Sequence, residues 1–213
     1  MTARHHPDEI LLGAYAAGTL DFGQHAAIAT HLLTCPECRG WVRSMECVGG
    51  SMLEALPPAS LPTDALAATQ ARLADAPLAH PAPPSGATDV AGLPAYLRSY
   101  RMGRWQWVAP RVHVRRIEAP QHSPTRVFLL RSGAGTQMLQ HSHTGIEMTC
   151  VLEGAFRHDG GHFRPGDFDY GDDTVDHRPM VDDGEACVCL VAMQGQLQLN
   201  GLIGRIIQPL VRL

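Results

Sequence analysis

Two histidines and a glutamate lie close together in the second half of the sequence. His141 and His143 are two residues apart, so in a β-strand both imidazoles point to the same face. Glu147 follows a turn at Gly145 and can add a carboxylate to the same pocket. His177, on a later strand-like segment, is the natural fourth ligand. Imidazole and carboxylate ligands of this kind suit zinc, manganese, ferrous iron or nickel.

A second group of potential metal ligands occurs near the N-terminus, where a histidine precedes a Cys-x-x-Cys pair. His31 and Cys35 are four residues apart and therefore adjacent on one face of a helix. Cys38 falls near the start of the next predicted helix, where the helix dipole is expected to lower the thiol pKa. A closed tetrahedral zinc site needs a fourth ligand, for which His5 and His6 are both candidates. We therefore predict a zinc ion that ties the first helices together.

Composition excludes several classes of function. The chain has 213 residues, a formal net charge of −4 and a pI of about 6.3, so it lacks the basic character of nucleic-acid-binding proteins. It has no uncharged apolar run of about 20 residues that would span a membrane. No apolar signal segment follows the first residues, so we expect a cytoplasmic protein. Its six cysteines are then expected to be free thiols or metal ligands rather than disulfides.

Hydrophobic periodicity divides the chain into two parts joined by a proline-rich segment. Helical spacing predicts four helices, over residues 7–17, 21–33, 36–50 and 64–73. Alternating patterns predict strands that include residues 111–115, 126–131, 148–152 and 186–191. We therefore predict a multidomain α + β protein. Residues 1–75 form a small zinc-stapled helical bundle, residues 76–95 a linker, and residues 96–213 an antiparallel β-sandwich or barrel whose final apolar segment begins at residue 201.

Two further sets of residues are candidates for sensing a signal and for contacting a partner. Cys187 and Cys189 alternate on one predicted strand, so both thiols face the same side. If that side is the interior they lie near the metal and can be oxidised; otherwise they are small core residues. Four apolar or aromatic residues of the first and third helices belong either to the core or to a partner-binding surface: Ile10, Leu11, Tyr15 and Trp41.

Both metal motifs resemble known families. The pattern G-x5-H-x-H-x3-E-x6-G over residues 135–154 resembles the first signature of the cupin superfamily. Pro165-Gly166-Asp167 together with His177 resembles the second signature, although Tyr170 stands where a proline is usual. The pattern H-x3-C-x2-C over residues 31–38, in a short helical domain, resembles the zinc-binding anti-sigma factor family. The resemblance covers nearly the whole chain.

This resemblance implies a transcription regulator and not an enzyme. It implies Zn²⁺ held by His6, His31, Cys35 and Cys38, and a second metal, Zn²⁺ or else Mn, Fe or Ni, in the cupin-like domain. It also implies that the chain binds a group 4 (extracytoplasmic-function) sigma factor of the σE type as a 1:1 heterodimer and keeps it from RNA polymerase. Release would follow singlet-oxygen stress sensed through the cupin-like domain.

One departure from redox-sensing relatives bears on the sensor. Those relatives carry a third cysteine upstream of the Cys-x-x-Cys pair, and this sequence has His6 at that position. A disulfide between the first and third helices therefore cannot form, and we predict that the N-terminal zinc site is structural.

The alternative function is a metal-dependent cupin enzyme, a dioxygenase or isomerase, with a regulatory zinc domain. It predicts a polar clamp for the substrate in the pocket, which Arg126 or Arg157 could supply. It also predicts turnover of a small organic acid when Fe²⁺ is added, whereas the regulator predicts stoichiometric metal without turnover.

Overall fold

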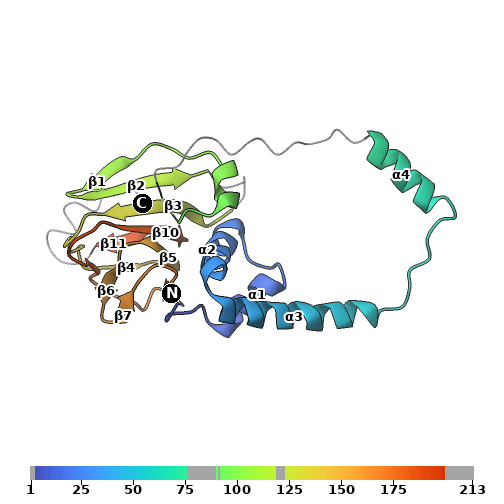
Figure 1. The fold of residues 1–213 in the computed structure, drawn as a ribbon, viewed down its shortest axis with the longest axis horizontal. Helices are drawn as coiled ribbons and strands as arrows, with labels where there is room; N and C mark the ends of the chain where they lie inside the picture. Colours follow the sequence, from blue (N-terminus) through green and yellow to red (C-terminus); the bar gives the residue numbers. More distant parts are fainter. Residues whose placement is uncertain (1–2, 76–89, 91, 119–122, 200–213) are drawn as a thin grey trace.

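The computed structural model describes residues 3–75, 90, 92–118 and 123–199. Figure 1 shows helices α1 to α3 packed beside a β domain, while α4 lies apart from both. The helices are α1 (Glu9–Ala16), α2 (Phe22–Thr34), α3 (Pro36–Glu54), α4 (Ala65–Asp75) and the 3-10 helix η1 (Ala95–Ser99). Among the described residues, no helix combines the length and the apolar character needed to cross a membrane.

Local sequence determines where the first three helices begin. The Asp8 carboxylate accepts a backbone N–H bond at the start of α1, and Asp21 forms a capping box at the start of α2. Cys35 is the N-cap of α3, with proline following it. Helix α3 continues to Glu54, past Gly49–Gly50, where the sequence predicted its end. Neither of these glycines adopts the left-handed conformation that commonly ends a helix.

The β domain is a sandwich of antiparallel strands. One layer is a six-stranded sheet in the order β1-β2-β3-β10-β5-β8, and the other consists of the sheets β11-β4 and β7-β6-β9. The sequence predicted a β-sandwich or a barrel. The described strands form a sandwich and do not close a barrel. The strands are β1 (Gln106–Ala109), β2 (Val112–Ile117), β3 (Arg126–Ser132), β4 (His141–His143), β5 (Glu147–Glu153), β6 (Phe156–His158), β7 (Gly161–Phe163), β8 (Phe168–Gly171), β9 (Met180–Val181), β10 (Cys187–Met193) and β11 (Leu197–Leu199).

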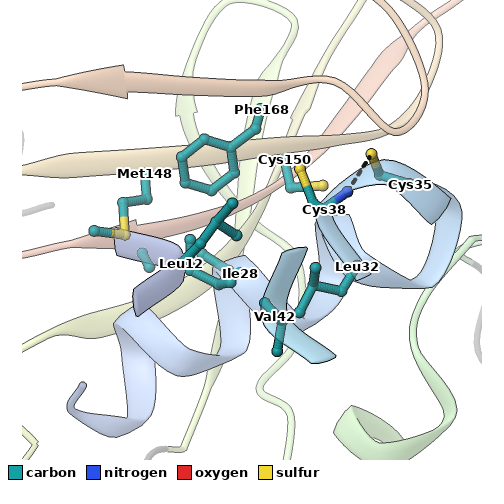
Figure 2. Close-up of a cluster of buried hydrophobic side chains, with 11 residues drawn as sticks. Leu12, Ile28, Leu32, Cys35, Cys38, Val42, Met148, Cys150 and Phe168 are labelled. Atoms are coloured by element: carbon teal, nitrogen blue, oxygen red, sulfur yellow. Dashed lines mark hydrogen bonds between the residues drawn. The ribbon is translucent and has the colours of Figure 1, made fainter. Parts of the chain in front are cut away.

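The helices and the large sheet share one hydrophobic core. Helix α2 packs on β5 and β10, and every residue of β10 is buried because both of its faces are covered. Figure 2 shows the shared cluster, which includes Leu12, Ile28, Leu32, Val42, Met148, Cys150 and Phe168. From the sequence we expected the linker to allow partly independent domain motion. Separating the two parts would expose this core to water, at a free-energy cost of about 1.5–3 kcal/mol for each large apolar side chain.

The segments at the edges of the predicted domains differ from expectation. Val90 and Leu93, within the predicted linker, are buried in the β domain together with Leu97 of η1. Residues 76–89 and 91 lie outside the described residues, as does the apolar tail predicted from residue 201. Helix α4 contains no buried residue. The described end of the linker segment is therefore part of the β domain's core.

Candidate metal centres

Four side chains converge where the first three helices meet. His6 precedes α1, His31 lies in the last turn of α2, and Cys35 and Cys38 occupy the N-cap and first turn of α3. Each offers one ligand atom, and these atoms all lie within 4.8 Å of one another. The structure therefore brings together all four residues that were predicted for the N-terminal site.

The distances fit a tetrahedral zinc ion. Zinc bonds of about 2.0–2.3 Å to nitrogen and sulfur place neighbouring ligand atoms roughly 3.3–3.8 Å apart. His6 Nδ1 lies 3.4 Å from Cys35 Sγ and 3.3 Å from Cys38 Sγ, and His31 Nε2 lies 3.3 Å from Cys38 Sγ. Three of the four side chains are buried, as in a structural site closed to solvent.

The geometry separates the two histidines between which the sequence left a choice. His6 is in ligand range of both thiols. The ring of His5 turns toward the β domain instead, where it packs at a tilt against Phe163 with 4.3 Å between centroids. His6 is therefore the fourth member of this set.

The acidity of Cys38 differs from the expectation based on the helix terminus. Burial and the adjacent Cys35 thiol raise the pKa of Cys38 to about 12, whereas the helix dipole alone was expected to lower it. Cys38 therefore stays protonated at neutral pH until a cation displaces its proton, so metal binding must release a proton from this thiol.

The second cluster lies in the β domain. His141 and His143 sit on β4 with both rings inward, and His177 pairs with His141 through backbone hydrogen bonds of 3.0 Å in each direction. Ligand atoms of the three histidines lie within 4.8 Å of one another. Glu147, at the start of β5, places Oε2 3.8 Å from His143 Nε2. All four predicted residues are thus close together, with Glu147 at the edge of the histidine group.

Unpaired nitrogen atoms show that this cluster suits a cation. His141 Nδ1–H donates to the carbonyl of Leu139 at 2.7 Å, which leaves Nε2 as a lone pair directed at His177 Nε2, 3.0 Å away. Among the described residues, both ring nitrogens of buried His143 and Nδ1 of His177 find no hydrogen-bond partner. Buried polar atoms without partners are costly and rare, and a metal ion would satisfy them.

The protonation of this cluster also favours cation binding. Burial lowers the pKa of His141 and His143, and burial and the neighbouring histidines lower the pKa of His177 to about 4. All three imidazoles are therefore neutral at pH 7, with lone pairs available. Burial raises the pKa of Glu147, so the metal-free pocket disfavours its charge.

Two polar residues beside this cluster, His158 and Asp169, were not predicted from the sequence. His158 Nδ1 accepts the N–H of Gly160 at 2.9 Å, so its Nε2–H donates to Asp169 at 2.9 Å. Together with His177 they form another group with metal-ligand spacing. Because the His158 nitrogens are already used, we interpret the two residues as a hydrogen-bonded pair beside the histidine cluster. The alternation of inward-facing and outward-facing residues on β6 and β8 could have indicated that His158 and Asp169 point inward. These strands are too short for such a period to be recognised in the sequence.

A cavity of about 410 Å³ opens above this cluster between the two layers of the sandwich. His141, Glu147 and His177 form part of its wall, and most of the remaining lining is apolar. Cys187 and Cys189 also face it, with 3.6 Å between their sulfur atoms. The alternation on β10 therefore points both thiols into the cavity that the metal cluster also lines.

Thiol alkylation should discriminate sharply between exposed and buried cysteines. Burial raises the pKa of Cys150 to about 12, so at pH 8 only about 1 in 10⁴ of its side chains is ionised, against roughly one quarter for an ordinary thiol. Cys47 is exposed. We expect iodoacetamide to label Cys47 roughly 1000-fold faster than Cys150 in the native protein. Mass spectrometry after timed quenching measures both rates, and comparable labelling would contradict the shared core.

Of the four predicted partner-facing residues, only Ile10 is well exposed, at 82%. Leu11, Tyr15 and Trp41 pack against the shared core, and Tyr15 stacks on His25 with 4.6 Å between ring centroids. The larger exposed apolar set, which sequence analysis missed, follows the second half of α3 through α4: Met45, Val48, Met52, Leu53, Leu56, Leu61, Leu66 and Leu73. The first two of these residues belong to the helical pattern of the third helix, but the period alone does not show what covers a helix.

Comparisons with known proteins agree with this arrangement. Residues 9–39 match the family described as a putative zinc-finger, and residues 97–198 match the ChrR cupin-like domain. The anti-sigma-E factor ChrR of Cereibacter sphaeroides is 36% identical over 216 residues, covering 100% of both chains.

A solved structure supports the same relationship. The crystal structure of Rhodobacter sphaeroides SigE in complex with the anti-sigma ChrR matches with a TM-score of 0.75 and 34% identity. The match covers 91% of this chain and 100% of that chain. The domain order, the zinc-finger match and full-length identity above 30% place the chain among transcription regulators and not among cupin enzymes. The chain belongs to the family of the anti-sigma factor ChrR.

Proposed function

We propose that this protein is an anti-sigma factor that binds a group 4 sigma factor of the σE type as a 1:1 heterodimer. While bound, the sigma factor cannot engage core RNA polymerase. Because RNA polymerase works in the cytoplasm, we place the protein there, without direct contact to nucleic acid. The observation that carries the proposal is the exposed apolar surface on α3 and α4, in a chain of the ChrR family.

This surface has the character of a partner-binding site. Met52 and Leu53 near the end of α3 are 68% and 69% exposed, and Leu66 and Leu73 of α4 are 72% and 71% exposed. Helix α4 has no buried residue and so packs on nothing in the described chain. A surface helix normally buries its apolar stripe, so a helix that leaves it in solvent requires a partner.

Transcription in vitro tests the function. We expect core RNA polymerase with a group 4 sigma factor from the same genome to transcribe its promoter, and the full zinc-loaded chain to silence it at a 1:1 ratio to sigma. The same chain should leave transcription by the housekeeping sigma factor unchanged. Continued transcription at a tenfold excess of the chain would refute the proposal.

We further propose metal ions at both clusters: Zn²⁺ held by His6, His31, Cys35 and Cys38, and Zn²⁺, or Mn, Fe or Ni, held by His141, His143, Glu147 and His177. The first set supplies a structural tie between helices, because four protein ligands leave no open position on zinc. In the second set the unpaired atoms of His143 and His177 support the assignment.

Metal analysis should separate the two sites. We expect about two metal ions per wild-type chain and about one in the His143→Ala variant. The variant should keep its inhibition of sigma, because the zinc-binding helices are unchanged. Asp173→Ala, in an exposed turn, is the surface control. Two bound ions in His143→Ala would contradict the assignment.

For the response we propose that singlet oxygen acts on the cupin-like domain, with Cys187 and Cys189 as candidate targets. The position of these two thiols supports their role as targets, because both line the cavity that the histidine cluster also lines. The N-terminal site, with His6 in place of an upstream cysteine, then remains structural. A photosensitiser should release sigma from the wild-type complex and from Cys47→Ser, but more slowly from Cys187→Ser/Cys189→Ser. Equal rates of sigma release from all three proteins would show that Cys187 and Cys189 are not the targets of singlet oxygen.

A further inference from the structure

A turn of the β domain reaches across to the N-terminal metal cluster. It joins β7 to β8, and the carbonyl of Gly166 within it accepts the Nδ1–H of His31 at 2.8 Å. This bond fixes the proton on Nδ1 and leaves Nε2, 3.3 Å from Cys38 Sγ, as the lone pair for zinc. A group of the cupin-like domain thus sets the tautomer and ring orientation of a zinc ligand.

The next residue of this turn holds the chain segment that carries His6. The Asp167 carboxylate, on a residue only 2% exposed, accepts backbone N–H bonds from Arg4 and His5 as well as from the turn itself. The N–H of Phe168 donates to the carbonyl of His5 at 3.1 Å. The segment before His6 is therefore attached to the edge of β8, which fixes the direction from which His6 approaches the thiols.

The approach of the turn to α2 is close enough to require glycine. Gly166 has φ +93°, and a Cβ atom there would lie 2.7 Å from the Thr34 hydroxyl oxygen. The Phe168 ring stands edge-on to the His31 ring, with 5.9 Å between centroids. Three consecutive residues thus contact the zinc ligands or their neighbours: Gly166 through its backbone, Asp167 through its carboxylate and Phe168 through its ring.

We propose that the turn formed by Gly166, Asp167 and Phe168 positions the zinc ligands His6 and His31, so that the cupin-like domain controls how firmly the helical domain holds its zinc. Strand β8 continues from this turn to Asp169, which lines the cavity and accepts a hydrogen bond from His158. One strand therefore contacts both clusters. This inference rests on the zinc site proposed above and adds a dependence of that site on the other domain.

The test compares two aspartate-to-asparagine substitutions in the full chain. Asp167→Asn keeps the size of the side chain but replaces one acceptor oxygen by an NH₂ group that faces backbone N–H donors. Asp172→Asn makes the same change at an aspartate whose carboxylate accepts bonds from the backbone N–H and the hydroxyl of Thr174, within its own loop. With Co²⁺ in place of zinc, the thiolate-to-cobalt absorption reports only on a site with cysteine ligands, and its loss to a chelator gives a release rate.

We expect Asp167→Asn to release the ion about 10- to 100-fold faster than wild type, and Asp172→Asn to release it at the wild-type rate. Equal rates for all three proteins would overturn the inference while leaving the zinc site intact. A wild-type chain without thiolate-to-cobalt absorption would instead overturn the zinc site itself.

Hydrogen exchange in the wild-type chain gives a second test that needs no variant to fold. The amides of Arg4 and His5 should be protected because both donate to the buried carboxylate of Asp167. Exchange of these amides at the rate of exposed backbone would contradict the attachment, whatever the variants show.

Discussion

Replacing Cys38 with serine is expected to abolish inhibition of the sigma factor. The thiolate lies in ligand range of both His6 and His31, so its loss opens the zinc site. Structural zinc contributes roughly 10–16 kcal/mol of apparent free energy in zinc-finger peptides, far more than the net stability of a small domain. We expect bound metal to fall from about two ions to one, with loss of helical circular dichroism.

Cys47→Ser is the matched control, since Cys47 is an exposed cysteine on the same helix. It should keep both metal ions and full inhibition. The metal of the cupin-like domain should persist in Cys38→Ser, because its ligands come from β4, β5 and the segment that carries His177, and none comes from the helices. A Cys38→Ser chain that lost one metal ion but inhibited like wild type would show that zinc is not required for sigma binding.

The double substitution Met52→Asp/Leu53→Asp is expected to weaken sigma binding by roughly 100-fold or more. Both side chains lie mostly in solvent, at 68% and 69% exposure, so the free protein loses little by their replacement. In a complex they would be buried, and two carboxylates would be carried out of water without partners. Titration calorimetry measures the affinity, and thermal unfolding of the free chain checks that its stability is unchanged.

Trp107→Asp is the control for this prediction. Trp107 is 66% exposed, like the α3 residues, but it lies on β1 of the β domain. Figure 1 shows β1 on the side of the molecule opposite α4. We expect wild-type affinity from this variant. A large loss with Trp107→Asp and none with Met52→Asp/Leu53→Asp would relocate the binding surface to the β domain.

The metal clusters could be predicted from sequence because their spacing is local. His141 and His143 face one side of any strand, and His31 and Cys35 face one side of any helix, whatever the surrounding fold. His6 was identified through family resemblance, and the physical reason for the choice comes from the structure: His6 lies in range of both thiols, while His5 packs against Phe163.

Residues that depend on tertiary contacts could not be predicted in this way. Asp167 looked like one residue of a tight turn, yet its carboxylate binds a segment more than 160 residues away in the chain. The period of α3 likewise did not show that Val48 would remain exposed, because a partner surface and a core have the same pattern.

The pKa of Cys38 shows the same dependence on packing. The helix terminus favours the thiolate, but burial and the neighbouring thiol have the larger effect and raise the pKa. Which effect on the pKa is larger depends on how deeply the thiol is buried, and burial cannot be read directly from the sequence.

The most direct test of the account is an equilibrium titration of a purified group 4 sigma factor from the same genome with the full zinc-loaded chain. We predict a 1:1 complex with a Kd in the nanomolar range, about −12 kcal/mol, and no binding to the housekeeping sigma factor. The affinity for the sigma factor should fall when zinc is removed, because the helices that present the α3–α4 surface then lose the ion that ties them together. Absence of binding to any group 4 sigma factor at about 10 μM, about −7 kcal/mol, would contradict the central claim.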